Sequence, residues 1–451
     1  MTGSKRQLHL NLFLMNTGHH EASWRHPDTA PRRVTELDYY REIAALAERG
    51  KLDSLFLADT YVLPETARHK VLHGLEPFTL LAALAAVTSR IGLIGTASTT
   101  YNEPYHIARK FASLDHLSGG RSGWNIVTTA SEGAAYNFGE RPLPEHAERY
   151  RRAGEFVEVV KALWHSWEPD ALLADKASGV YAELERVRPI AHRGDYFAVR
   201  GPLNVPPTPQ GEPVLVQAGS SADGRAFAAG VAEAVFTAQS SLERAQAFYR
   251  EMKARAVQAG RSADELLILP GLYTVVGDTE AEARELAREL DELTVPAYGL
   301  QRLSTLFKVD LTGYALDAPV PLELLPEREA IVGNRGRFEL IEEMVRRERP
   351  TLRELIRRTA GSRGHAAVIG TPAQIADTMM RWFEDGAADG FNLMPSHLPG
   401  GLRDFVDKVV PELQSRGLFR AEYEGRTLRE HYGLPPVHTV RARVGAAEAS
   451  R

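Results

Sequence analysis

The 451-residue sequence contains no cysteine. This absence excludes disulfide bonds, thiolate metal ligands and a cysteine nucleophile, and it is typical of a protein from a reducing compartment. The chain also lacks an excess of basic residues: 54 Lys and Arg stand against 59 Asp and Glu, a formal net charge of −5. A general nucleic-acid-binding protein needs a basic surface, so we expect no nucleic-acid partner.

Long apolar runs are missing as well. No stretch approaches the roughly 18 consecutive apolar residues that a membrane-spanning helix requires. The stretch "MTGSKRQLHLNLFLMN" alternates apolar and polar residues, and no small-residue cleavage site follows it, so it does not resemble a secretory signal. We therefore expect a cytoplasmic protein that has no membrane partner.

Several catalytic signatures are also absent. The sequence has no H-E-x-x-H, no H-x-H after its first predicted strand, no G-x-S-x-G and no G-x-x-x-x-G-K-[ST]. These absences disfavour a metal-dependent hydrolase, a serine hydrolase of the nucleophile-elbow type and a P-loop enzyme. We expect no metal ion.

What the sequence does contain is a regular alternation of strands and helices. The predicted strands are 8–15, 52–59, 90–98, 121–129, 213–220, 234–239, 266–277 and 390–396. Helical segments separate them, such as 34–50, which ends at a glycine, and 371–386, which begins with Thr-Pro. This alternation predicts parallel strands joined by right-handed crossovers. Eight of them favour an α/β fold of the (β/α)₈, or TIM-barrel, type. A doubly wound sheet is the alternative, and it lacks the expected G-x-G-x-x-G after the first strand.

Two segments interrupt the alternation. Residues 168–212 are rich in proline and glycine, and we expect a short hairpin there around "YFAVRGPL". Residues 295–365 contain helical pieces, such as "RFELIEEMVRRE", and a long insertion of this kind in a barrel is often functional. We predict a single domain over 1–436, with insertions near 168–212 and 295–365, and a flexible tail over 437–451.

The stretch "LSGGRSGWNIVTT", residues 117–129, poses a question about its three glycines. A glycine-rich turn either binds phosphate or only joins a helix to a strand. In a barrel this turn lies at the amino ends of the strands, which serve stability, whereas ligands bind at the carboxyl ends. We therefore predict a structural turn, and we place the ligand-facing end of the stretch at Thr128 and Thr129.

The carboxyl ends of the other predicted strands supply the candidate site residues. His19 and His20 follow the first strand, Asp59 and Tyr61 the second, and Thr96 lies near the end of the third. Asp59 is either a structural anchor or a site residue, and the two histidines are either solvated or functional.

Two further motifs have both a structural and a functional interpretation. In "AGSSADG", Ser220 and Ser221 lie where a strand turns into a helix, so they either cap the helix or help its free N–H groups to bind phosphate. In "HAERY", His146 and Tyr150 are four residues apart and share one helix face. They are either surface residues or residues that face the barrel mouth.

Several stretches together resemble the luciferase-like, flavin-dependent monooxygenases, in the branch that includes nitrilotriacetate, EDTA, dibenzothiophene-sulfone and long-chain alkane monooxygenases. They are "LDSLFLAD", "EPFTLLAALAAVTSRIGLIGTASTTYNEPYHIARKFASLDHLSGGRSGWNIVTT", "NFG", "HAERY", "DYFAVRGPLNVPPTPQGEPVLVQAGSS" and "IGTPAQIAD". The resemblance extends from about residue 8 to 435. It implies a (β/α)₈ barrel with insertions, in agreement with the alternation of elements.

The resemblance also implies a two-component system. A separate NAD(P)H-dependent flavin reductase supplies FMNH₂, and the barrel protein uses it with O₂ to oxygenate a small organic substrate through a flavin hydroperoxide or peroxide. By position, Asp59 and Thr96 lie near the flavin ring or ribityl chain. His146 and Tyr150 line the flavin site, Ser220 and Ser221 hold the phosphate, and Asn137 in "YNFG" is a weaker candidate.

On the substrate side the candidates are His19, His20, Phe56, Tyr61 and Glu76, with residues 295–365 as a lid. A homodimer or homotetramer is the family expectation. Two alternatives share the barrel: a deazaflavin-dependent oxidoreductase and a non-catalytic flavin-binding protein. Arginines of the insertion, in "RRERP" and "RELIRR", either attract an anionic substrate or form a solvated helix face.

Overall fold

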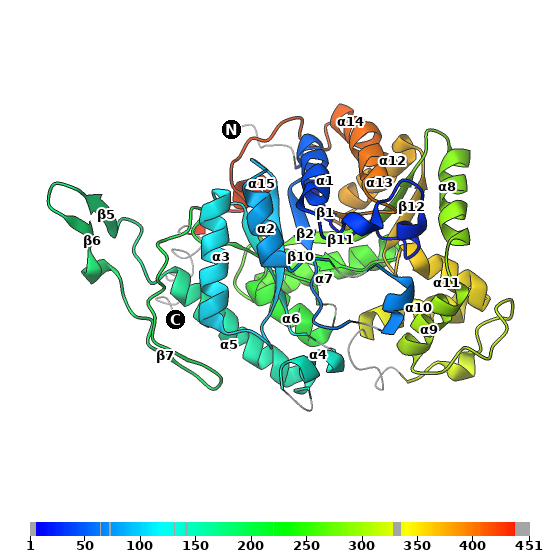
Figure 1. Ribbon diagram of the computed structural model, residues 1–451, viewed down its shortest axis with the longest axis horizontal. Helices are drawn as coiled ribbons and strands as arrows, with labels where there is room; N and C mark the ends of the chain where they lie inside the picture. The colour runs from blue at the N-terminus through cyan, green and yellow to red at the C-terminus, as the bar shows by residue number, and fades with distance from the viewer. Residues whose placement is uncertain are drawn as a thin grey trace.

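The computed structural model describes residues 6–63, 65–71, 74–129, 131–139, 143–219, 221–327 and 335–437. Its centre is a parallel sheet that closes on itself (Figure 1). The barrel strands are β1 (His9–Phe13), β2 (Ser54–Leu57), β3 (Gly92–Ser98), β4 (Ser122–Val127), β9 (Val214–Gln217), β10 (Ala234–Thr237), β11 (Leu267–Val276) and β13 (Gly390–Pro395). They pair in this order, and β13 returns to β1, so the predicted eight-stranded barrel is confirmed.

Helices cover the outside of the barrel and fill the connections. The helices are η1 (Ser23–Arg25), η2 (Pro31–Arg33), α1 (Leu37–Arg49), η3 (Glu65–His69), α2 (Pro77–Ala85), α3 (Pro104–Ser118), α4 (Glu132–Asn137), α5 (His146–Trp164), η4 (Leu184–Arg186), α6 (Ala222–Val231), α7 (Leu242–Gln258), η5 (Ala263–Glu265), α8 (Glu280–Glu292), α9 (Pro296–Phe307), η6 (Leu322–Leu324), α10 (Arg335–Glu348), α11 (Leu352–Gly361), α12 (Pro372–Glu384), α13 (Gly400–Asp404), η8 (Phe405–Val409), α14 (Val410–Ser415) and α15 (Leu428–His431). None of the described helices is long and apolar enough to cross a membrane.

The inside of the barrel is packed with side chains. Strand residues alternate between the two faces of the sheet, so Phe13, Phe56, Ile94 and Phe236 belong to one buried cluster inside it. Leu428 of α15 joins this cluster. Helix α15 therefore closes the amino-terminal end of the barrel, and the opposite end is left for ligands.

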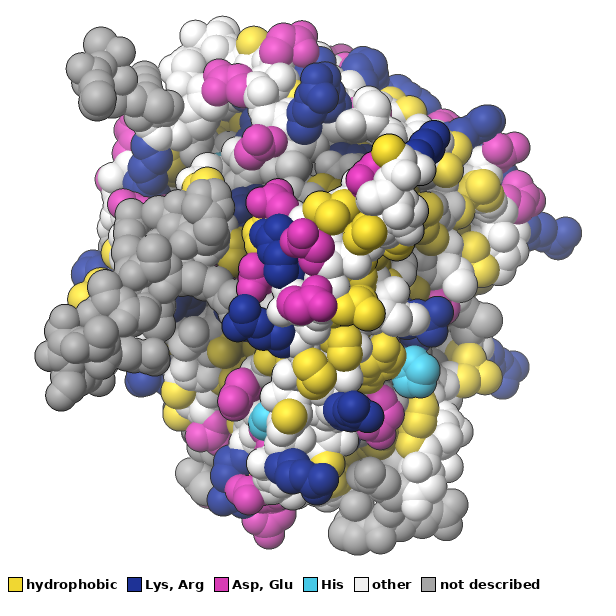
Figure 2. Space-filling model, turned by 90° about the vertical axis from the view of Figure 1, so that its left-hand side faces the viewer, with side chains coloured by type: hydrophobic (Ala, Val, Ile, Leu, Met, Phe, Trp, Pro, Cys, Tyr) yellow, Lys and Arg dark blue, Asp and Glu magenta, His cyan; other side chains and the backbone are white. Residues whose placement is uncertain are grey.

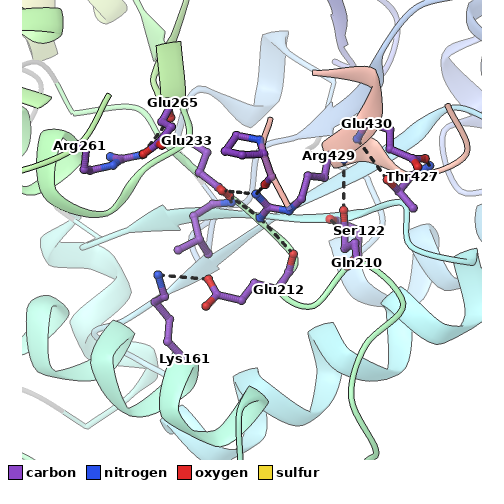
Figure 3. Close-up of polar contacts among 12 residues, drawn as sticks. Ser122, Lys161, Gln210, Glu212, Glu233, Arg261, Glu265, Thr427, Arg429 and Glu430 are labelled. Atoms are coloured by element: carbon purple, nitrogen blue, oxygen red, sulfur yellow. Dashed lines mark hydrogen bonds and ion pairs between the residues drawn. The ribbon is translucent and has the colours of Figure 1, made fainter. Parts of the chain in front are cut away.

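Polar contacts hold α15 against the amino-terminal end of the barrel (Figure 3). The guanidinium of Arg429 is ion-paired with Glu233 at 2.6 and 3.0 Å. The backbone N–H of Arg429 donates to Gln210, and Gln210 in turn donates to the carbonyl of Ser122 at the start of β4. Because Arg429 is buried, these contacts replace the water that its charge loses on folding.

The glycines of residues 117–129 lie at this same closed end. Gly119 ends α3 in the left-handed conformation with φ of 68°, and a Cβ at Gly123 would lie 3.1 Å from Leu428. The buried Arg121 between them donates to the backbone carbonyls of Ser118 and Ile91. The turn is structural, as predicted.

The segment over 168–212 forms two small antiparallel hairpins that extend to the left in Figure 1. They are β5 (Leu172–Asp175) with β6 (Val180–Ala182), and β7 (His192–Arg193) with β8 (Ala198–Val199). The sequence predicted only the second. The first hairpin and the short helix η4 that follows it carry exposed apolar side chains, among them Tyr181 of β6 at 68% and Leu184 of η4 at 71% exposure. Figure 2, which faces this side, shows hydrophobic side chains among charged ones.

The insertion over 295–365 returns to the barrel through a ninth parallel strand, β12 (Ala366–Gly370), which the sequence analysis did not predict. Strand β10 pairs with β11 only as far as Pro270. Strand β12 then pairs with Leu272–Val276 of β11, while β13 holds the other edge of β11. The chain just before β12 therefore passes over the carboxyl end of β10.

Candidate functional site

Polar groups from two parts of the chain, α5 and the residues that begin α6, meet at the start of α6. Ser221 caps this helix, and its hydroxyl accepts a hydrogen bond from the N–H of Gly224 at 3.1 Å. His146, at the first turn of α5, lies 3.4 Å from the same hydroxyl through Nε2. The ring of Tyr150, one turn further along α5, packs on His146 at 5.0 Å. The structure thus brings together Ser221, His146 and Tyr150, whose part in flavin binding stays a prediction, whereas Ser220 lies outside the described residues.

Two glycines keep this helix start open. A Cβ at Gly219 would lie 3.0 Å from the Tyr150 hydroxyl, and a Cβ at Gly224 would lie 2.9 Å from it. A helix start with free N–H groups, hydroxyls and no Cβ is suited to binding an anion. One acidic group competes for the imidazole, because the Asp223 carboxylate accepts a hydrogen bond from Nδ1 of His146 across 2.8 Å. We refer to Ser221, His146, Tyr150 and the α6 start as the anion cradle.

Aromatic rings form the floor of the barrel mouth. Phe13 packs against Phe56 and Phe236 with ring centroids 5.3 and 5.2 Å apart. His365, directly before β12, stacks on Phe236 at 5.2 Å with an interplanar angle of 7°. Phe56 is thus a buried floor residue. A flat, apolar floor of this kind suits an aromatic ring system.

A short polar chain lies beside the floor. The hydroxyl of Thr96 donates to the carbonyl of Leu57 at 2.7 Å and accepts from the Asn125 amide at 2.8 Å. Both side chains are buried, and Oδ1 of Asn125 has no hydrogen-bond partner among the described residues. A buried acceptor without a partner is costly, so this oxygen is placed to accept a bond from a ligand.

Asp59 lies at the end of β2 and is half-buried. Burial raises its pKa to about 6, and the charge of Glu76 contributes to the rise. Glu76 itself is exposed, and its two carboxylate oxygens accept from the N–H groups of Phe78 and Thr79. Glu76 is therefore the N-cap of α2 and acts on Asp59 through its charge.

Tyr61 and Asn137 belong to one side of the mouth. The side chain of Asn137 donates to the backbone carbonyl of Tyr61 at 2.6 Å. The Tyr61 ring packs edge-on against Phe138 and Tyr101, and burial raises the pKa of its hydroxyl. Asn137 thus fixes a loop backbone and leaves the tyrosine ring facing the aromatic neighbours.

The two neighbouring histidines point in different directions. His19 is fully buried; its Nε2 donates to the carbonyl of Phe13 at 2.8 Å, and Nδ1 has no partner among the described residues. Burial and the nearby charge of Arg363 hold its pKa well below the ordinary value, so the ring is neutral at pH 7. His20 instead faces α8, where Nε2 lies 3.4 Å from Asp291.

The sequence analysis missed Arg149, which is buried and donates to the carbonyls of Thr128 and Thr129 at 3.3 and 2.7 Å. It holds the predicted ligand-facing end of β4 against α5. Its spacing was the available signal, because a residue three positions after His146 shares its helix face. Arg363 and His365 were missed too, since the strand that places them was not predicted.

One group of described residues has the mutual spacing of metal ligands: His26, Asp28 and His397, with ligand atoms within 4.8 Å of one another. The N–H of Asp28 donates to Nδ1 of His26 at 3.3 Å, which places the proton of the neutral ring on Nε2. That ring then has no free lone pair, and the two imidazoles lie 4.4 Å apart. We assign the group to ring packing between two loops.

Comparison with known proteins adds independent information. The chain is 53% identical to N-acetyl-S-(2-succino)cysteine monooxygenase from Bacillus subtilis, over 96% of this chain and 98% of that protein. It is 48% identical to nitrilotriacetate monooxygenase component A from Aminobacter aminovorans, over 96% and 97%.

A crystal structure of a riboflavin lyase with modified FMN and riboflavin superposes with a TM-score of 0.84. It has 34% identity, and the match covers 95% of this chain and 96% of that chain. The sequence model described as luciferase-like monooxygenase matches residues 13–389. These findings confirm the resemblance read from the sequence. The chain belongs to the luciferase-like monooxygenase family, and it is an enzyme of the monooxygenase type.

Proposed function

We propose that this monooxygenase is the oxygenating component of a two-component system. It takes FMNH₂ from a separate NAD(P)H-dependent reductase and uses O₂ to oxygenate a small organic substrate. One relative is component A of nitrilotriacetate monooxygenase, and this name supports a second component. The absence of a G-x-G-x-x-G after the first strand agrees with a nicotinamide cofactor that acts on another protein.

The anion cradle is the observation that carries the proposal. Ser221, His146 and Tyr150 converge on a helix start that Gly219 and Gly224 keep free of Cβ atoms. These groups fit a phosphate, which accepts hydrogen bonds from hydroxyls and backbone N–H groups. The aromatic floor fits a flavin ring, and Oδ1 of Asn125 can accept from a ring N–H. The residues present therefore fit FMN.

When bound, the reduced flavin supplies the electrons that activate O₂, and the protein contributes binding, orientation and exclusion of water. The cradle fixes the phosphate end. Thr96 and Asn125 are held by each other and by the Leu57 carbonyl, so they present a fixed set of polar atoms. Such preorganised groups cost little reorganisation during the reaction.

The mouth is arranged to keep water out. Phe13, Phe56 and Phe236 cover the floor, and neutral His19 adds an uncharged ring against Phe13 at 4.7 Å. Exclusion of water protects a reactive reduced cofactor from side reactions. We propose that residues 295–365, whose last residues before β12 cross the carboxyl end of β10, serve as a lid. Asp59, with a pKa of about 6, is an anion at pH 7 and is the candidate proton acceptor.

Two flavins that differ only in the phosphate test the proposal. We expect the wild-type protein to bind FMN more tightly than riboflavin in fluorescence titrations. Ser221→Ala and Tyr150→Phe should each raise the Kd of FMN about tenfold or more, since a hydrogen bond to a charged group contributes about 1.5–3 kcal/mol. The Kd of riboflavin should not change.

The matched control is Tyr314→Phe, which removes a hydroxyl from an exposed tyrosine of the insertion. It should leave both dissociation constants unchanged. If the Tyr150 and Ser221 variants bound FMN and riboflavin more weakly by the same factor, the anion cradle would not hold the phosphate. A wild-type protein that binds neither flavin would contradict the proposed function itself.

We propose further that the chain forms a homodimer or homotetramer through the β5–β6 hairpin and the adjacent η4, where Tyr181 and Leu184 are exposed apolar side chains that a partner subunit would bury. Light scattering of the wild type and of Tyr181→Ser/Leu184→Ser tests this, and a monomeric wild type would refute it. The deazaflavin-dependent alternative predicts hydride transfer without O₂ consumption, so an oxygen electrode separates it from oxygenation.

A further inference from the structure

Arg363 has no ionic or hydrogen-bonding partner among the described residues, although it is half-buried beside the barrel mouth. Its Nε is buried without a hydrogen-bond partner. A guanidinium in this position has lost part of its hydration and has gained no replacement from the protein. An acceptor group on a bound ligand would replace the hydration that the Arg363 guanidinium has lost.

The position of Arg363 follows from the ninth strand. Strand β10 stops opposite Pro270 and β12 starts opposite Leu272 on the same edge of β11, so the residues before β12 cross the carboxyl end of β10. His365, two residues after Arg363, stacks on Phe236 of β10 and confirms this crossing. Arg363 thus belongs to the segment that borders the aromatic floor.

Three elements meet around Arg363. Its charge influences the pKa of His19 in the β1 loop, of Tyr273 on β11 and of Tyr298 on α9. All three of these side chains are buried. The Arg363 charge therefore lies close to three buried side chains, and the low dielectric of such surroundings strengthens an interaction with an anion.

The two acidic groups nearby each have another ionic partner, although Oε2 of Glu21 has no hydrogen-bond partner among the described residues. Glu21 lies 3.1 Å from Arg302, and Asp291 lies 3.4 Å from His20. Neither forms an ion pair with Arg363. The backbone of Arg363 is in the left-handed region with φ of 51°, a conformation that few residues other than glycine or asparagine adopt without strain. Nothing in the packing of the described chain explains an arginine at this position.

We propose that Arg363 is a specificity-determining residue that binds a carboxylate group of the substrate, so that the enzyme acts on small organic acids. The guanidinium fork matches a carboxylate with two parallel N–H···O bonds. Nδ1 of His19, a buried acceptor, suits an N–H or O–H group of the same substrate. This inference rests on the proposed function, because it places the substrate at the flavin site.

An acid and its uncharged methyl ester test the inference by calorimetry on the FMN-loaded protein. The acid is N-acetyl-S-(2-succino)cysteine, and the neutral comparison is its trimethyl ester. We expect the wild type to bind the acid at least tenfold more tightly than the ester. Arg363→Gln should raise the Kd of the acid about tenfold to a hundredfold and leave the Kd of the ester unchanged. In the coupled reaction it should raise KM more than it lowers kcat.

Arg358→Gln is the control, because Arg358 is an exposed arginine of α11 that pairs with Glu348. It should bind the acid as the wild type does, and Arg363→Lys should retain part of the affinity. The inference is overturned if Arg363→Gln binds the acid normally, if the ester binds as tightly as the acid, or if neither the acid nor nitrilotriacetate binds. FMN affinity, measured in the same samples, stays normal in each of these cases. Its loss in the wild type would refute the proposed function instead.

Discussion

Replacing Arg429 by methionine should destabilise the closed end of the barrel by about 3 kcal/mol. The side chains of Arg429 and Glu233 are only 5% and 16% exposed, and two N···O contacts of 2.6 and 3.0 Å join them. Without the guanidinium, Glu233 keeps a single bond from the N–H of Leu215. Removing one partner of a buried pair costs about 3–5 kcal/mol. The lower end applies because the charge of Arg261 also acts on Glu233.

Urea unfolding followed by far-UV circular dichroism measures this loss as a shift of the midpoint at constant slope. The double variant Arg429→Met/Glu233→Gln should lose clearly less than the sum of the two single variants, because it leaves no unpaired charge. Lys51→Gln breaks a surface pair with Glu422, which is 79% exposed, and should cost under about 1 kcal/mol. The reasoning would be refuted if Arg429→Met lowered the free energy of unfolding as little as Lys51→Gln does. It would also be refuted if the loss in the double variant equalled the sum of the losses in the two single variants.

Three further outcomes follow from local geometry. Burial raises the pKa of Asp59 to about 6, so the carboxyl is charged above this pH and neutral below it. The pH profile of kcat/KM should therefore show an ionisation near pH 6. Asp59→Asn should remove this ionisation, and Glu76→Gln should move it to lower pH. Profiles that coincide with the wild type would contradict this role. A Cβ at Gly219 would lie 2.5 Å from the Gln217 amide and 3.0 Å from the Tyr150 hydroxyl. Gly219→Ala should therefore raise the Kd of FMN at least about tenfold. An unchanged Kd in a titration would show that the anion cradle adapts to the added methyl group. Gly119 has φ of 68° with no atom near its Cβ position, so Gly119→Ala should lower the free energy of unfolding by about 1 kcal/mol without altering FMN binding; a loss above about 3 kcal/mol would mean that the site is crowded.

The barrel could be predicted because each strand carries its own signal. Fully buried runs such as Gly92–Ser98 and Leu267–Val276 show the continuous apolar pattern of a parallel strand that is covered on both faces. Strand β12 lacked this signal, since three of its five residues are not buried. It pairs only with the far half of β11, where the barrel no longer covers it on both sides. Its partner decides its conformation, and a single sequence does not show the partner.

The site was predictable to the extent that it follows the ends of strands. His146, Tyr150 and Ser221 could be brought together because α5 and α6 follow neighbouring strands, β4 and β9. The directions of individual side chains could not be derived. His19 and His20 are adjacent in sequence, yet one packs on Phe13 and the other faces α8. The backbone N–H groups of the two histidines donate to the carbonyls of Pro395 and Ser396, at the end of β13. These contacts, which are far apart in sequence, decide the two directions.

Strand β12 has a consequence for how such a barrel diversifies. The segment between α8 and β12 rejoins the sheet through main-chain hydrogen bonds to Leu272–Val276 of β11, and these bonds do not depend on side-chain identity. The segment is thus attached to the barrel at a fixed place, the β11–β12 pairing, whatever side chains it carries. The residues just before β12, such as Arg363, take no part in this pairing. We therefore expect substitutions there to change the proposed carboxylate selectivity while the barrel strands keep their arrangement.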